Sequence, residues 1–199
     1  MVILALLALF AGIACGLSGA GASVLSLLTS HVDIILCLLM FLVGISVGLH
    51  RGLLANLRKY HIRIFIIPAG VVAGSLAGGM LCGLVTPFTM GESTAVACGL
   101  GWYSLTGVTL GNLAGAQVGS IAFLSNLMRE IFSFFCIPIL SRRLNSYSCI
   151  ASAGATSEDT TLPMMIKYTD EETVVLSVIN GVICSALVPV LISVCYQIF

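Results

Sequence analysis

The chain has 199 residues, of which 59% are hydrophobic and only 8% are charged, and its mean hydropathy is +1.15. A soluble domain carries about 25% charged residues, so this composition excludes a water-soluble protein and indicates an integral membrane protein in a lipid bilayer. The formal net charge is zero, so no basic field favours nucleic acid as a partner.

Five apolar stretches are long enough to cross a bilayer as helices, which takes about 20 residues each. They lie near residues 2–18, 32–50, 64–85, 115–140 and 173–197. The first resembles a signal peptide because it is apolar. It lacks a basic start and further spans follow, so we interpret it as the first transmembrane helix.

Two further stretches, 94–113 and 149–166, have a suitable length but a different composition. Both are rich in Gly, Ser and Thr, which makes a continuous helix costly. Irregular backbone at membrane depth is tolerated only where protein or a water-filled cavity surrounds it. We therefore expect each stretch to be a re-entrant segment or a broken helix.

The cations predict an orientation, because lysine and arginine concentrate in cytoplasmic loops. Loop 50–63 holds four of the eight cations, and Arg142 and Arg143 follow helix 115–140. Placing both groups inside puts the N-terminus in the cytoplasm. It also requires segment 94–113 to enter from the outer side and to return there.

The distribution of cations hardly indicates whether segment 149–166 crosses the membrane or returns. A lipid-exposed crossing would bury Glu158 and Asp159 at about 2.5–3.5 kcal/mol each, so we favour a return, which leaves the C-terminus outside. The expected fold class is an all-α integral membrane protein with about five transmembrane helices and two re-entrant segments in an inverted arrangement. We expect one transport domain over residues 1–199, although no residue-level repeat is evident.

Helix 115–140 carries a polar stripe of Asn126, Glu130 and Ser133, spaced to share one face. Glu130 precedes Arg142 by twelve residues, about 18 Å along a helix, which places it near mid-membrane. An acid at this depth is a candidate functional group. The alternative is a structural contact in which Glu130 pairs with Arg129.

The second polar segment places Glu158 and Asp159 among four hydroxyl residues, within "GATSEDTTLP" (154–163). We expect one acid to face a cavity, and a half-helix to begin near Pro163, because proline is tolerated in the first turn. The alternative is an ordinary cytoplasmic loop with solvated acids. The hydroxyl residues are Thr156, Ser157, Thr160 and Thr161.

The first polar segment contains the single tryptophan, in "GLGWYSLTG" (99–107). Trp102 is either an interfacial anchor or a cavity wall, with Tyr103 and Ser104 offering hydrogen bonds. In the second case an aromatic ring beside a cation would add cation–π attraction.

The sequence favours no enzyme, metal site or cofactor. The eight cysteines are scattered without a C-x-x-C pair, and the three histidines are not spaced as ligands. "GLSG" (16–19) fits a short serine-protease motif, but that chemistry needs a membrane histidine as base, and none follows His61.

Three motifs occur in order, "GLGWYSLTG" (99–107), "NLMREIF" (126–132) and "GATSEDTTLP" (154–163), after "FLVGISVGL" (41–49). Together they resemble the LysO lysine exporter family of bacteria, over essentially the whole chain. Family members commonly carry additional N-terminal helices, so the chain resembles a short form. We therefore expect a homodimer or a separately encoded partner half.

The resemblance implies a multi-pass protein of the bacterial inner membrane that exports L-lysine and thialysine, as a proton antiporter and not as an enzyme. It assigns function to Glu130 and Asp159, and none to Glu158, which occupies a variable position. Na⁺-coupled transport of another solute and a non-transporting subunit remain alternatives. The expected substrate or proton site comprises Glu130, Asp159, Asn126, Trp102, Tyr103, Ser104, Thr156, Ser157, Thr160 and Arg129.

Helix 64–85 carries Gly70, Gly74 and Gly78 at four-residue spacing, a pattern typical of close helix packing in membranes. This ridge either forms a dimer interface or packs inside one chain against helix 32–50.

Overall fold

The computed structural model describes residues 2–18, 31, 34, 38, 41, 42, 45 and 63–198. Loop 50–62 and most of the expected helix 32–50 lie outside the described residues. The chain forms two compact units, Met1–His50 and Arg51–Phe199. In the first unit, α1 (Val2–Ser18) is a helix, as expected for an apolar stretch that ends at a glycine-rich sequence.

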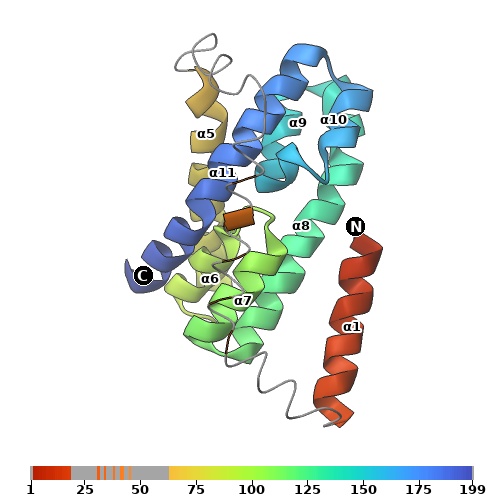
Figure 1. The fold of residues 1–199 in the computed structure, drawn as a ribbon. Coiled ribbons are helices and arrows are strands. Elements are labelled where there is room, and N and C mark those ends of the chain that lie inside the picture. The colour runs from red at the N-terminus through yellow and green to blue at the C-terminus, as the bar shows by residue number, and fades with distance from the viewer. Residues whose placement is uncertain are drawn as a thin grey trace. The chain divides into compact units, whose positions relative to one another are not determined.

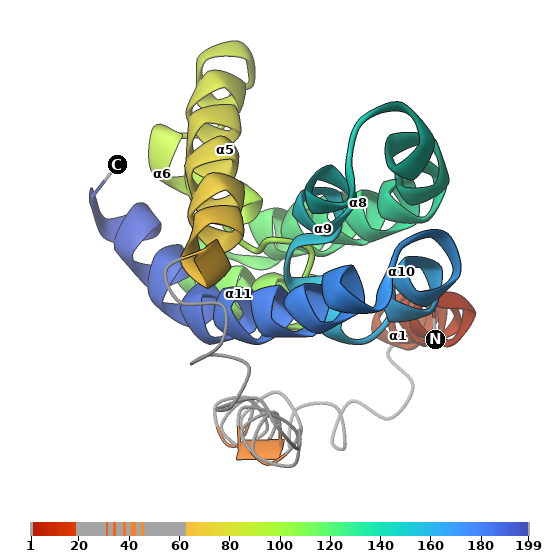
Figure 2. The ribbon, with the colours of Figure 1, turned by 90° about the horizontal axis from the view of Figure 1, so that it is seen from above.

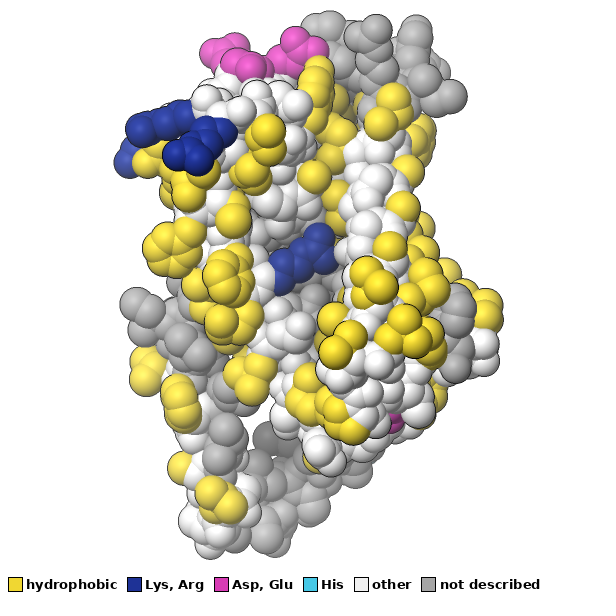
Figure 3. Space-filling view, turned by 180° about the vertical axis from the view of Figure 1, so that it is seen from behind, with side chains coloured by type: hydrophobic (Ala, Val, Ile, Leu, Met, Phe, Trp, Pro, Cys, Tyr) yellow, Lys and Arg dark blue, Asp and Glu magenta, His cyan; other side chains and the backbone are white. Residues whose placement is uncertain are grey.

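The described part is all-helical, which confirms the predicted all-α class, while the number of membrane crossings stays a prediction. Three of its helices, α5, α8 and α11, are long and apolar enough to cross a membrane. Figure 3 shows apolar side chains over much of one face, with charged side chains gathered at one end and cationic side chains also at mid-height. The second unit consists of α5 (Arg63–Val85), α6 (Met90–Ala97), α7 (Tyr103–Ala114), α8 (Ala116–Arg143), α9 (Ser146–Ala153), the 3₁₀ turn η1 (Gly154–Glu158), α10 (Leu162–Tyr168) and α11 (Glu171–Ile198).

Both polar segments are broken helices at opposite ends of the second unit (Figure 1). The pair α6–α7 lies at the end where α5 finishes and α8 starts, because Cys82 and Val118 line one cavity there. The pair α9–α10 lies at the other end, where Asn145 and Asp170 line a second cavity. Each segment therefore enters and leaves at one end, in an inverted arrangement.

The first broken segment begins at Met90, four residues before the sequence prediction, because Thr89 and Glu92 form a capping box. The Thr89 hydroxyl accepts from the Glu92 N–H at 3.1 Å, and the Glu92 carboxylate accepts from the Thr89 N–H at 2.9 Å. The spacing T-x-x-E was visible in the sequence as a helix-start signal.

Side-chain caps also start the later helices. The Asn145 side chain accepts from the Ser148 N–H at the start of α9. Asp170 accepts from the Thr173 N–H at 2.8 Å before α11, and this bond to the ionised form lowers the pKa of Asp170.

Glycines set the closest helix contacts. In Figure 2, α6 lies beside α5 and α9 lies beside α8. A Cβ added to Gly79 would lie 2.6 Å from the Thr94 Cα, and one added to Gly119 would lie 2.6 Å from the Gly111 Cα. By contrast, a Cβ added to Gly70, Gly74 or Gly78 meets nothing within 4 Å among the described residues.

We predict that Gly79→Ala destabilises the protein by about 1–3 kcal/mol, because the added methyl group overpacks the α5–α6 contact. The neighbouring Gly78→Ala is the matched control, since its Cβ points into open space and alanine favours helix by up to about 1 kcal/mol. Thermal unfolding of the detergent-purified variants measures the difference. Equal melting temperatures for the two variants would contradict the packing described here.

Candidate functional site

The first helix break, residues 98–102 between α6 and α7, meets the second helix break, residues 154–161 between α9 and α10, inside the second unit. The Ala155 N–H, in η1, donates to the Leu100 carbonyl, in the first break, at 2.9 Å. The backbones are so close that a Cβ added to Gly154 would lie 2.5 Å from the Leu100 oxygen. Leu100, Gly101 and Gly154 have φ values of 52°, 99° and 63°, in the left-handed region that favours glycine.

Asn126, on α8, holds the first break through its amide. Its nitrogen donates to the carbonyls of Val96, at 2.9 Å, and Ala122, at 3.0 Å. Its oxygen accepts from the Gly101 N–H at 2.9 Å. Gly99 makes room for this amide, since a Cβ there would lie 2.6 Å from the Asn126 nitrogen. The break's backbone groups are thus satisfied by a side chain instead of water.

The second break is held by α11. Asn180 donates to the Gly154 carbonyl at 2.9 Å and to the Ser157 hydroxyl at 3.0 Å. Ser157 and Ser177 donate to each other's carbonyls at 2.8 and 2.7 Å. Sequence reasoning missed Ser177 and Asn180, although they form a polar stripe with Cys184 on a mostly apolar helix.

Glu130 is fully buried on α8, one turn beyond Asn126. Neither carboxylate oxygen has a hydrogen-bond partner among the described residues. Ser133, the next member of the stripe, is satisfied by the carbonyls of Arg129 and Ser152. A buried carboxylate without a partner is costly, so Glu130 is the one member of the stripe left with the capacity to bind a proton or a cation.

Arg129 points away from Glu130. Its Nη1 donates to the Ser75 hydroxyl, on α5, at 3.1 Å, and a Cβ added to Gly154 would lie 3.0 Å from its Nη2. The guanidinium therefore lies at the C-terminal end of α9, where a cation interacts favourably with the helix dipole. The alternative of a Glu130–Arg129 pair does not match these contacts.

Asp159 and Thr160 are the members of the second break that reach the vicinity of Glu130. Both lie close enough to Glu130 to affect its carboxyl group electrostatically, although neither Glu130 oxygen has a hydrogen-bond partner among the described residues. Asp159 is exposed, and its Oδ1 accepts from the Thr160 hydroxyl at 3.2 Å.

The other polar residues of this segment are engaged in holding the break. The Thr156 hydroxyl donates to the Ala153 carbonyl, and Ser157 is tied to α11. Glu158 is half-buried, and its Oε1 accepts from the Ser185 hydroxyl at 2.8 Å. The interpretation as an ordinary loop with solvated acids does not fit the packing of Glu158, whereas Asp159 is exposed.

Tyr103 joins the first break to this site. Its ring packs edge-on against Phe123, on α8, with centroids 5.2 Å apart, and its hydroxyl interacts electrostatically with Glu130 and Asp159. Trp102 and Ser104 flank it and are half-buried at the start of α7. Tyr103 from the first polar segment and Asp159 and Thr160 from the second are thus the predicted residues close enough to Glu130 to interact with it electrostatically.

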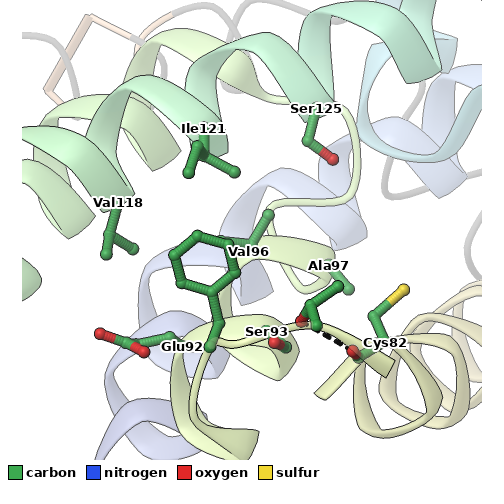
Figure 4. Close-up of a pocket in the computed structure, with 10 residues that line it drawn as sticks. Cys82, Glu92, Ser93, Val96, Ala97, Val118, Ile121 and Ser125 are labelled. Carbon is green, nitrogen blue, oxygen red and sulfur yellow. Dashed lines mark hydrogen bonds between the residues drawn. The ribbon is translucent and has the colours of Figure 1, made fainter. Parts of the chain in front are cut away.

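A separate cavity of about 240 Å³ lies between α5, α6 and α8 (Figure 4). It is mostly apolar, with Phe88, Val96, Val118 and Ile121 among its lining residues and Glu92 at its side. None of the sequence-predicted site residues lines it.

Two oppositely placed broken helices that meet beside a buried acid are an arrangement common among secondary transporters. The sequence matches the family described as "Lysine exporter LysO" over residues 6–196, and the chain belongs to this family. The resemblance predicted from the motifs is therefore confirmed.

Two named relatives are similar to the chain. Lysine exporter LysO of Escherichia coli is 36% identical over 182 residues, which cover 92% of this chain and 60% of that protein. A Haemophilus influenzae protein with a provisional name as a lysine exporter is 32% identical over 158 residues, covering 79% and 80%. The chain thus spans about 60% of the length of the first relative. No solved structure matches the chain.

We predict that Gly154→Ala disrupts the crossing of the two breaks, because its methyl group would lie 2.5 Å from the Leu100 carbonyl oxygen. Gly115→Ala is the control, since Gly115 has a positive φ of 92° but nothing within 4 Å of an added Cβ. Both variants bear backbone strain of about 1–3 kcal/mol, so the difference in thermal stability isolates the crossing contact. An equal loss in both would show that strain alone acts.

Proposed function

We propose that this chain exports L-lysine, and analogues such as thialysine, from the bacterial cytoplasm in exchange for protons. Membership of the lysine exporter family supports the substrate. The observation that carries the proposal is the fully buried Glu130 carboxylate, without a partner among the described residues, beside two crossing helix breaks. Transport, in place of an enzymatic reaction, is the role that this arrangement supports.

The charges of lysine suit this site. Lysine has two ammonium groups and one carboxylate, so a buried site must supply anions for the cations. Glu130 and Asp159 are the acids that interact near the breaks, and we assign them to the ammonium groups. Thr160 is placed to assist them, and Trp102, Tyr103 and Ser104 to form the wall.

The lysine carboxylate needs hydrogen-bond donors. We assign it to the N-terminal end of α7, a twelve-residue half-helix that begins at Tyr103 in the first break. The helix dipole favours an anion at this end. Arg129 is a less suitable donor because its guanidinium already donates to Ser75.

Coupling arises from competition for one carboxylate. A protonated Glu130 is neutral and does not attract an ammonium group, whereas an ionised Glu130 needs a cation in the buried site. Lysine would displace the proton on the cytoplasmic side, and a proton would displace lysine on the outer side. We propose that the N-terminus is cytoplasmic and the C-terminus outside, in the inner membrane.

We predict that Glu130→Gln and Asp159→Asn each lower lysine transport at least tenfold at normal protein level, because each keeps its shape and loses its charge. Glu158→Gln is the control and should be milder, since glutamine can keep the hydrogen bond with Ser185. The assay is uptake of labelled lysine into inverted vesicles with an acidic lumen.

Uptake that depends on a Na⁺ gradient and ignores the pH gradient would contradict the proton coupling. Wild-type uptake by Glu130→Gln would contradict the proposed site. A variant that loses assembly along with transport would instead indicate that the acids hold the helices together.

We also propose a homodimer, formed along Gly70, Gly74 and Gly78 of α5, whose Cβ positions are open among the described residues. We predict that Gly74→Leu lowers the mass of the detergent-purified protein from dimer to monomer. Phe65→Ala, at an exposed position on the opposite side of α5, should keep the dimer. A monomeric wild type would exclude the homodimer, and a Gly74→Leu protein that does not fold would place the ridge inside one chain.

A further inference from the structure

Two asparagines contact the two helix breaks: Asn126 accepts from a glycine N–H, and Asn180 donates to a glycine carbonyl. Asn126 bonds to Gly101, 25 residues before it, and Asn180 bonds to Gly154, 26 residues before it. Both glycines have positive φ. Asn126 lies about 15 Å along α8 from its first residue, and Asn180 about 14 Å along α11. Each part of the inverted arrangement therefore carries an asparagine at a similar place on its long helix.

The amide group suits this position chemically. A broken helix leaves backbone carbonyls without partners at one end and N–H groups without partners at the other. Asparagine can donate and accept at once. Asn126 does both, to Val96 and from Gly101. Asn180 donates twice, to Gly154 and Ser157, and its oxygen accepts from the Cys184 thiol at 3.8 Å.

Both amides have their hydrogen-bonding capacity occupied by the protein. Asn126 and Asn180 are almost fully buried, and neither has an unsatisfied polar atom among the described residues, whereas Glu130 has two. The residue four positions after Asn126 is Glu130, and the residue four positions after Asn180 is Cys184. Any shift of the first break would therefore change the wall next to the buried acid.

We propose that Asn126 and Asn180 are paired positioning residues: each fixes one helix break at the crossing point, and neither binds the transported solute. The transport part of this inference rests on the proposed function. The structural part does not, because the shape of each break can be measured without a substrate.

The test compares Asn126→Leu and Asn180→Leu, which keep the approximate volume and lose the hydrogen bonds. Asn112→Leu is the matched control, because Asn112 is exposed on α7. The first readout is alkylation of the native Cys98 and Cys184, both fully buried, followed by mass spectrometry of the purified full chain. We expect at least fivefold faster labelling of Cys98 in Asn126→Leu and of Cys184 in Asn180→Leu. The control should label like wild type.

The second readout is the rate of lysine uptake by each variant, divided by the wild-type rate at the same pH. We expect the maximal rate of both Leu variants to fall at least tenfold, with KM changed less than threefold. Asn126→Asp should recover toward wild type as pH falls, because only a protonated aspartate can donate to the Val96 carbonyl. Asn126→Leu should show no recovery.

The proposal would be overturned if both cysteines in folded Leu variants were alkylated at the wild-type rate. A KM raised tenfold at an unchanged maximal rate would also overturn it, since that result indicates direct solute binding. If the Leu variants do not fold, Asn126→Asp decides the question. The rate of its Cys98 labelling, divided by the wild-type rate, must decrease as the pH is lowered. If wild type transports no lysine, the proposed function fails, and the labelling still decides the role of the amides.

Discussion

The hydrogen bond between the Ala155 N–H and the Leu100 carbonyl is the contact on which the remaining arrangement depends. Water is absent from a bilayer core, so every backbone group at that depth needs a partner within the protein. A broken helix exposes such groups, and here each break supplies part of what the other lacks. Side chains of α8 and α11 satisfy much of the remainder, which explains why asparagines and serines lie inside long apolar helices.

Against this background the state of Glu130 is informative. Asn126 and Ser133 share its helix face, and both have backbone hydrogen-bond partners in α8 and in the neighbouring broken segments. Leaving a buried polar group without a partner costs about 1–3 kcal/mol, and more for a charged group. The fold that satisfies its neighbours leaves this one carboxylate free among the described residues. A protein is expected to retain such a free-energy cost where the carboxylate binds a proton or a cationic solute.

Much of this fold is predictable from composition. The Gly, Ser and Thr content of the two polar segments predicts the breaks, and the polar stripe on α8 predicts Glu130 as a candidate. The partners of each side chain are not predictable in this way, because they depend on how distant helices cross. Gly78 and Gly79 are adjacent and identical in type, yet only Gly79 contacts α6. Likewise, no local signal directs Arg129 toward Ser75 or distinguishes Asn180 from other polar residues in an apolar helix.

The second unit has two halves, α5–α8 and α9–α11, each with one helix break. Both halves hold the break with an asparagine, but they differ in the residue one helical turn after it. Four residues after the asparagine, α8 has an acid and α11 has a cysteine. The second acid near Glu130 comes from the other half, because Asp159 belongs to the second break. A site divided between halves has a useful property under the proposed function. Movement of one half against the other would change the separation of the two carboxylates, and with it the affinity for a solute with two ammonium groups. Within one rigid half the same two acids would hold the solute equally well on both sides, and a ligand with equal affinity for both states shifts nothing.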